Sequence, residues 1–83
     1  MKKVKELIQT CFACPEQYEG KLESGEEIYI RCRWGHGYLQ IGNEIVSEID
    51  YDDSYRGTFK EGDVLKLFLD AGIYWNGNYE HEN

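Results

Sequence analysis

Residues 28–42, IYIRCRWGHGYLQIG, decide the fold that this sequence predicts. Aliphatic side chains alternate here with cationic or aromatic ones, and the alternation breaks once, at Gly35-His36-Gly37. A period of two is typical of a strand with one buried face, because successive side chains point to opposite faces of a sheet. The stretch therefore predicts a β-hairpin with an apolar face and a polar face.

The apolar face also fixes the expected turn. An even number of loop residues pairs Trp34 with Leu39 and Cys32 with Ile41, whereas an odd number would place the two aliphatic residues beside the arginines. We expect the turn at residues 35–38 or at their inner pair, with glycine supplying the positive φ.

A strand before this hairpin is predicted by the same alternation. Tyr18, Gly20 and Leu22 alternate with charged residues, and an odd loop around Ser24-Gly25-Glu26 lets them share the apolar face. The expected pairs are Leu22 with Ile28, Gly20 with Ile30, Tyr18 with Cys32, Glu19 with Arg31 and Lys21 with Tyr29. After the hairpin, residues 44–53 predict a fourth short strand or an irregular excursion.

Two segments have the spacing of helices. Near the start, four residues fall at i, i+3, i+4 and i+7, which predicts a short helix that ends near Cys14-Pro15. These residues are Val4, Leu7, Ile8 and Cys11. Residues 58–61 resemble a capping box, and the apolar residues that follow recur at helical spacing up to Gly72. A strand remains the alternative for residues 59–71, because leucines also alternate there.

Together these elements predict an α+β fold: a short N-terminal helix, a three- to four-stranded antiparallel meander, and a C-terminal helix packed on one sheet face. One small domain is expected over residues 1–75, followed by a polar flexible tail over residues 76–83. The expected core residues of the sheet are Tyr18, Leu22, Ile28, Ile30, Cys32, Trp34, Leu39 and Ile41.

The charge balance limits the classes of partner. Sixteen acidic and nine basic residues give the 83-residue chain a net charge of −7, which disfavours direct binding of nucleic acid because that needs clustered Lys and Arg. No apolar run is long enough to span a bilayer, and we expect neither a membrane segment nor a signal peptide. Three cysteines, an odd number, suit a reducing compartment, so we expect a cytoplasmic protein.

No catalytic set is evident in the sequence. The two histidines, His36 and His81, have no obvious nucleophile and orienting carboxylate beside them, and no phosphate-binding glycine motif is present. We therefore expect a non-enzymatic interaction protein without a cofactor. The leading surface is acidic and would face the Lys and Arg side chains of a basic partner, which could itself bind nucleic acid. Its residues are Glu44, Glu48, Asp50, Tyr51, Asp52, Asp53 and Tyr55.

An alternative site lies on the polar face of the hairpin. Arginines beside aromatic rings can hold a phosphate and stack a base, so this face could bind or sequester a nucleotide signal. The same pattern is also typical of ordinary cross-strand pairs, with Glu19 occupying Arg31. The candidate residues are Tyr29, Arg31, Arg33, His36, Tyr38 and Gln40.

A zinc-stabilised domain is a further alternative. Cys11, Cys14, Cys32 and His36 follow the spacing C-x2-C-x17-C-x3-H, and thiolates and imidazoles are the ligands of tetrahedral zinc. Against this, the strand pattern places Cys32 among the core residues, where free cysteine behaves as a small hydrophobe.

The run from Tyr18 to Gly35, preceded by Cys14-Pro15, resembles a pattern in small uncharacterised acidic proteins of phages and mobile elements. The resemblance covers about residues 11–42. It implies a counter-defence inhibitor that binds a host protein in the host cytoplasm, and it assigns no functional residue.

Overall fold

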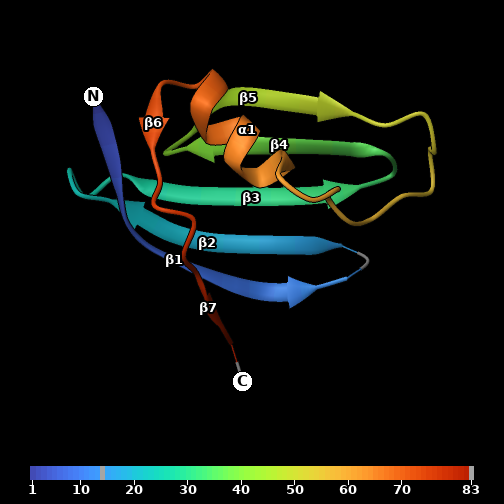
Figure 1. The fold of residues 1–83 in the computed structure, drawn as a ribbon, viewed down its shortest axis with the longest axis horizontal. Coiled ribbons are helices and arrows are strands. Elements are labelled where there is room, and N and C mark those ends of the chain that lie inside the picture. The colour runs from blue at the N-terminus through green and yellow to red at the C-terminus, as the bar shows by residue number, and fades with distance from the viewer. Residues whose placement is uncertain (14, 83) are drawn as a thin grey trace.

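The computed structural model describes residues 1–13 and 15–82, and within them seven strands and one helix form (Figure 1). In chain order these are β1 (Lys2–Phe12), β2 (Glu16–Leu22), β3 (Glu27–Arg33), β4 (His36–Ile41), β5 (Glu44–Asp50), α1 (Asp63–Asp70), β6 (Ile73–Tyr74) and β7 (Glu80–His81).

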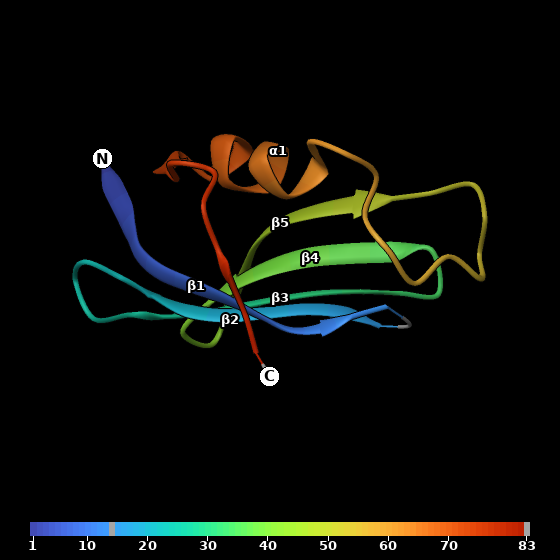
Figure 2. The same cartoon turned by 60° about the horizontal axis from the view of Figure 1, so that its bottom comes forward.

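All of these strands belong to one curled sheet. Strands β1 to β5 are successive antiparallel neighbours, and the order across the sheet is β5-β4-β3-β2-β1-β6. The short strands β6 and β7 both run parallel to β1. Figure 2 shows α1 lying over one face of the sheet. We call this the inner face and the opposite one the outer face.

The core lies between α1 and the inner face. The helix contributes Val64, Leu67 and Phe68, and Phe59 joins them from the loop before it. Of the eight expected core residues in the sheet, seven are buried, and Trp34 is the exception. The buried sheet residues from this set are Tyr18, Leu22, Ile28, Ile30, Cys32, Leu39 and Ile41.

The predicted α+β fold class is wrong, because the chain is mostly β and its described part contains one short helix. Strand β1 occupies the segment where we expected the N-terminal helix. Its pairing with β2 shifts by one residue between positions 4 and 6 and again between positions 9 and 11. Each β-bulge adds a residue to β1, so side chains three apart return to the same face. Two bulges therefore produced the spacing that we interpreted as helical.

The first predicted hairpin has the correct faces and the wrong pairs. Strands β2 and β3 place Tyr18 opposite Ile30 and Gly20 opposite Ile28, so the apolar residues share the inner face as expected. The turn, however, lies at residues 23–25, where the amide of Gly25 donates to the carbonyl of Leu22. A turn centred one residue earlier moves every pair by two positions, which preserves the faces.

The turn of the second hairpin is also displaced. Strands β3 and β4 pair Ile30 with Leu39 and Arg33 with His36, which leaves Trp34 and Gly35 as the two-residue turn. The even loop length is confirmed, and the expected turn at residues 35–38 is wrong. Gly37 lies inside β4 instead, where a Cβ atom would collide with the ring of Phe59. The space that Phe59 needs therefore explains this glycine.

The segment that we left open between helix and strand contains α1. The helix begins after Gly62, which has a φ of 84°, and not at the expected capping box of residues 58–61. Gly72 follows its end with a φ of 72°, as a C-terminal glycine cap requires. The helix is eight residues long.

The remaining segments close the ends of the inner face. Residues 51–62 form the β5–α1 loop, which hydrogen-bonds to Glu16 and Gly35 through the backbone. Residues 76–82, for which the sequence predicts a polar tail, run beside β1, with β7 paired to it and the Glu82 amide donating to the Gln9 carbonyl. Among the described residues, no helix has the length and apolar character needed to cross a membrane.

Candidate functional site

The outer face of β3 and β4 gathers all six residues of the alternative ligand site. Cross-strand pairing forms one row from Arg33, His36 and Asp50, and a second row from Gln17, Arg31, Tyr38 and Glu48. A third row contains Glu19, Tyr29 and Gln40. The pairing that we expected between Glu19 and Arg31 is wrong, because the first turn begins earlier than predicted.

Trp34 is the residue that the sequence misplaced. Its φ of 56° and the 72° of Gly35 give the two positive values that a type I′ turn needs. The turn directs the indole out of the core, and 63% of Trp34 is exposed. The Arg33 guanidinium lies 5.2 Å from the centre of the indole ring.

The backbone of this turn is fixed by the β5–α1 loop. Gly35 donates its N–H to the carbonyl of Arg56 at 2.8 Å and accepts from the N–H of Tyr51 at 2.7 Å. A Cβ atom on Gly35 would lie 2.6 Å from the carbonyl oxygen of Asp53, so the loop packs directly on the glycine. As a result the rings of Trp34 and Tyr55 lie 6.4 Å apart, nearly edge to face.

A hollow of about 300 Å³ opens beside this turn. Its lining residues are Arg31, Arg33, Trp34, His36 and Tyr38. We call these five residues the outer-face site. Within residues 1–13 and 15–82, neither Arg31 nor Arg33 forms an ion pair. Both guanidinium groups are therefore available to an external anion.

His36 connects the outer-face site to acidic residues of β5. Its Nδ1 lies 2.7 Å from Oδ1 of Asp50, and its Nε2 lies 3.1 Å from Oε1 of Glu48. Both ring nitrogens can donate to carboxylates at the same time only in the imidazolium form. The two carboxylates thus hold the ring in place beside Tyr38, whose ring centre is 6.1 Å away.

Tyr29 and Gln40, the remaining residues of the alternative ligand site, lie at the edge of the outer-face site. The ring centres of Tyr29 and Tyr38 are 6.1 Å apart. Burial raises the pKa of Tyr38 above its ordinary value, and the neighbouring Tyr29 adds to the effect. Gln40 donates its side-chain N–H to the carbonyl of Gly42.

The acidic surface that we predicted from the sequence adjoins the same site. Glu44, Glu48 and Asp50 lie on β5, whereas Asp52, Asp53 and Tyr55 are exposed in the β5–α1 loop. Tyr55 is 82% exposed. Because Tyr55 neighbours Trp34 and the carboxylates of β5 contact His36, the two surfaces predicted separately are one continuous surface. We call Glu48, Asp50, Asp52 and Asp53 the acidic rim.

Tyr51 differs from the other members of the predicted acidic surface. Its hydroxyl donates to Oδ2 of Asp63 at 2.5 Å and accepts from the N–H of Lys60 at 3.0 Å. Burial, together with the hydrogen bond to Asp63, raises the pKa of Tyr51 to about 12. The Arg56 guanidinium lies over the ring, 5.1 Å from its centre. The ring of Tyr51 is thus engaged within the molecule.

The residues of the zinc alternative lie on different parts of the sheet. Cys32 is buried on the inner face, where burial raises the pKa of its thiol to about 11. His36 lies on the outer face between carboxylates, and Cys11 lies on β1, opposite Gln17 of β2. Cys14 lies outside the described residues. Across residues 1–13 and 15–82, no group of three or more Cys, His, Asp or Glu side chains is placed to hold a metal.

Comparisons with protein-family models, with curated proteins and with solved structures found no match to this chain. The phage context and the counter-defence role implied by the resemblance therefore have no support, and they form no part of the function proposed below.

Sequence reasoning found the arginines and tyrosines of this surface and missed Trp34. The missed signal is the pair Trp34-Gly35 itself, which can serve as a two-residue turn once Gly37 is allowed inside a strand. Gly37 lies inside the strand because the ring of Phe59 needs the space beside it, and Phe59 is 22 positions after Gly37 in the chain. The contact between Trp34 and Tyr55 had no signal in the local pattern.

Proposed function

We propose that this chain is a non-enzymatic interaction module, and that it binds a basic protein surface through the outer-face site and the acidic rim. One observation carries the proposal: Trp34 is exposed, in a strained turn, next to the exposed ring of Tyr55. Backbone strain that the surroundings impose is concentrated at functional sites in proteins.

The composition of the surface supports a protein partner. Trp, Tyr and Arg are the residues most enriched among the energetic hot spots of protein interfaces. Trp34 and Tyr55 would enter an apolar recess of the partner, and Arg33 would meet a carboxylate beside it. The acidic rim would then contact Lys and Arg side chains around that recess.

The net charge of −7 supports a basic partner. Long-range attraction between oppositely charged proteins accelerates their encounter, and dissolved salt screens it. Binding should therefore weaken as ionic strength rises, mainly through the association rate.

The test begins with a photo-crosslinking amino acid in place of Tyr55, in cells that naturally make the protein, followed by mass spectrometry of the crosslinked partner. The purified partner is then titrated with the wild type and with Trp34→Asn, which removes the indole and retains a residue suited to the turn. We expect the Kd for Trp34→Asn to rise at least about tenfold, the cost of losing one hot spot.

Two further variants complete this experiment. Tyr74→Asn removes an exposed aromatic ring from β6, at the opposite end of the sheet from the β3–β4 turn (Figure 1), and should leave the Kd unchanged. Reversal of Asp52 and Asp53 to lysine should abolish most of the salt dependence. A partner that binds Trp34→Asn and the double reversal as tightly as the wild type would disprove the proposal.

The free arginines favour a second candidate function, the binding of a nucleotide. Arg31 and Arg33 would hold the phosphate, and Tyr38 or Trp34 would stack on the base. In a thermal-shift assay against linear and cyclic nucleotides, a ligand in large excess over its Kd must raise the melting temperature. Arg31→Gln with Arg33→Gln should remove that shift, and no shift of the wild type at millimolar nucleotide would exclude this candidate.

A further inference from the structure

A second hollow, of about 460 Å³, lies on the inner side of the molecule, away from the outer-face site. It opens between α1 and the C-terminal segment, which crosses the sheet beside the helix (Figure 1). Aromatic residues from three parts of the chain line it, together with two carboxyl groups, those of Glu16 and the exposed Glu61. The aromatic residues are Tyr18, Phe59, Trp75 and Tyr79.

The carboxyl group of Glu16 is held rigidly at this hollow. Its Oε1 accepts from the N–H of Phe59 at 2.9 Å, and its Oε2 accepts from the hydroxyl of Tyr18 at 2.5 Å. The Tyr18 hydroxyl in turn accepts from the side-chain amide of Gln9 at 3.1 Å. Only 9% of Glu16 is exposed. Each carboxyl oxygen has one bond and retains a free lone pair.

Glu16 has no cationic partner among residues 1–13 and 15–82. Lys60 also lines the hollow, but its Nζ lies over the ring of Tyr51, 5.6 Å from the centre. The Arg56 side chain donates from Nε to the carbonyl of Thr58 at 2.7 Å. Buried carboxylates are rarely found without a paired cation. The hollow therefore contains a buried acidic group that forms no ion pair with any described residue.

The aromatic rings around this carboxyl group have fixed orientations. The rings of Tyr18 and Tyr79 meet edge to face at 5.2 Å, and those of Trp75 and Tyr79 lie 6.4 Å apart. The indole N–H of Trp75 donates to the carbonyl of Asn78 at 2.9 Å, which holds the indole against the C-terminal segment. Ring faces attract cations through their quadrupole, and groups of such faces are used to recognise quaternary ammonium.

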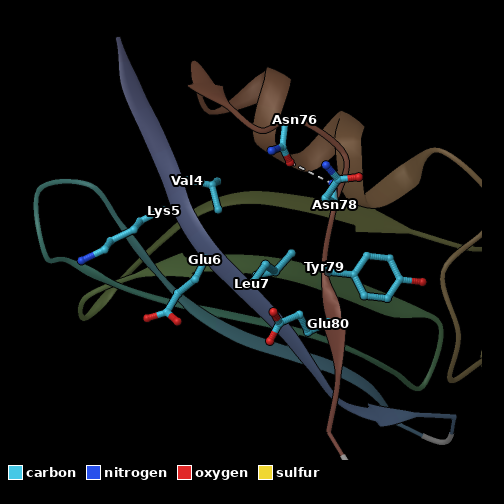
Figure 3. Close-up of a pocket in the computed structure, with 8 residues that line it drawn as sticks. All are labelled: Val4, Lys5, Glu6, Leu7, Asn76, Asn78, Tyr79 and Glu80. Atoms are coloured by element: carbon cyan, nitrogen blue, oxygen red, sulfur yellow. Dashed lines mark hydrogen bonds between the residues drawn. The ribbon is translucent and has the colours of Figure 1, made fainter.

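Tyr79 also forms a boundary to a smaller, polar hollow between β1 and the C-terminal segment, of about 230 Å³. Figure 3 shows the Tyr79 ring pointing away from β1, while Glu6 and Glu80 border the smaller hollow. Tyr79 is the one aromatic residue that lines the smaller hollow, and the carboxyl groups there are exposed, so the two spaces differ in the ligand chemistry that they suit.

We propose that the inner hollow binds an alkylammonium cation, with the Glu16 carboxylate supplying the opposite charge and the rings of Tyr18, Trp75 and Tyr79 packing around its carbon substituents. An anion is disfavoured in this hollow because the Glu16 carboxylate would repel it. A bare metal ion is disfavoured because no group of three or more Cys, His, Asp or Glu side chains within residues 1–13 and 15–82 is placed to hold one. Two sources carry this chemistry: a free small molecule such as choline, or the methylated side chain of a lysine in another protein.

NMR titration of the isotope-labelled full chain tests the proposal directly. Tetramethylammonium and choline should shift the indole N–H resonance of Trp75, which the Trp34→Asn variant distinguishes from that of Trp34. The matched control ligand is 3,3-dimethylbutan-1-ol, a neutral molecule with the shape of choline. Millimolar choline should give saturable shifts and the alcohol should not. Equal responses to both, or none to either cation, would overturn the proposal.

Three variants locate the binding energy. Glu16→Gln removes the charge and can still accept from the Phe59 amide, so choline should bind at least about tenfold more weakly. Tyr79→Leu alters a half-exposed ring and should weaken choline without loss of fold. Tyr74→Leu, outside the hollow, should change nothing. If Glu16→Gln does not fold, unchanged binding to Tyr79→Leu still contradicts the proposal.

A trimethyl-lysine peptide, its unmodified counterpart and choline distinguish the two sources. Tighter binding of the trimethylated peptide than of choline identifies a side-chain ligand, and the reverse order identifies a small molecule. Either order supports the proposal. Because Trp34 and the acidic rim do not line this hollow, Trp34→Asn should bind choline normally, which separates this site from the one assigned above.

Discussion

Trp34 has the only positive φ of any non-glycine residue in the described part of the chain, 56°. A left-handed conformation costs an ordinary L-residue roughly 1–2 kcal/mol. Asparagine adopts it far more readily, and Asn-Gly is the preferred pair for a type I′ turn. The strain at Trp34 therefore predicts that the chain becomes more stable when asparagine replaces this tryptophan.

We expect Trp34→Asn to raise the free energy of unfolding by about 1 kcal/mol, or the melting temperature by roughly 4–8 °C. Urea unfolding followed by circular dichroism measures it. Gly35→Ala is the opposite control, because its Cβ would approach the Asp53 carbonyl to 2.6 Å in a backbone of positive φ. If Trp34→Asn were less stable than the wild type, the indole would have a structural role, contrary to the proposed interaction role.

The sequence could identify most single residues of the core, and not the buried polar ones. Ile28, Ile30 and Leu39 are inside because alternation requires it. Glu16 is buried because its carboxyl group meets the amide of Phe59, 43 residues away in the chain. No local pattern contains such a contact, so neither the inner hollow nor its carboxyl group could be predicted.

At the level of elements, β5 is an open edge of the sheet. Its side chains include exposed Ile45 and Val46, beside Glu44 and Glu48. Unpaired edges invite pairing with another chain, and charges on an edge strand oppose it. We therefore expect the acidic residues of β5 to oppose self-association, and two of them, Glu48 and Asp50, also belong to the acidic rim.

Replacement of Glu44 and Glu48 by threonine should cause self-association that increases with protein concentration, because threonine favours strands and carries no charge. Light scattering after size-exclusion chromatography measures the mass. Glu61→Thr with Glu82→Thr changes the net charge equally, outside the sheet, and should behave as the wild type does. The same mass for both double variants at every concentration would rule out a protective role for the β5 carboxylates.

The period of the apolar pattern explains why strands β2 to β4 could be predicted from the sequence and β1 could not. In β2 to β4 the pattern of apolar residues keeps a period of two, so the shared face follows from the sequence even where the exact pairs are displaced. In β1 the two bulges change the period, and Val4 and Leu7 become inner-face neighbours three residues apart. A helix and a bulged strand then have the same pattern, and only the pairing with β2 distinguishes them.

At the scale of the whole molecule, three weak acids in the described part of the chain have large upward pKa shifts, and Tyr38 shifts in the same direction. Burial is the first cause of the raised pKa in each: about 11 for Cys32 against an ordinary 9.0, about 12 for Tyr51 against 10.0, and a still larger upward shift for Tyr18. Unfolding exposes these groups, and in alkaline solution they then release protons. The neutral forms thus stabilise the fold fully below about pH 9, and that contribution is lost as pH rises through the folded pKa values.

We therefore expect the urea midpoint of the wild type to fall between about pH 9 and pH 12. Cys32→Ala should reduce the slope in the lower part of this range and Tyr51→Phe in the upper part, whatever their effect at neutral pH. Tyr55→Phe, at an exposed ring, should reproduce the wild-type slope. Parallel curves for all four proteins would contradict this account.

The bond from the Phe59 amide to Glu16 also has a consequence for the order in which the chain assembles. The turns of the β2–β3 and β3–β4 hairpins contain three and two residues, whereas the hydrogen bond between Phe59 and Glu16 joins residues that are 43 positions apart. Since the entropy lost on closing a flexible loop grows with the logarithm of its length, the longer closure costs about 2 kcal/mol more in an otherwise unfolded chain. We therefore expect the meander to form first. Once it has formed, a shorter flexible loop connects Glu16 to Phe59, and only then is the carboxyl group of Glu16 dehydrated.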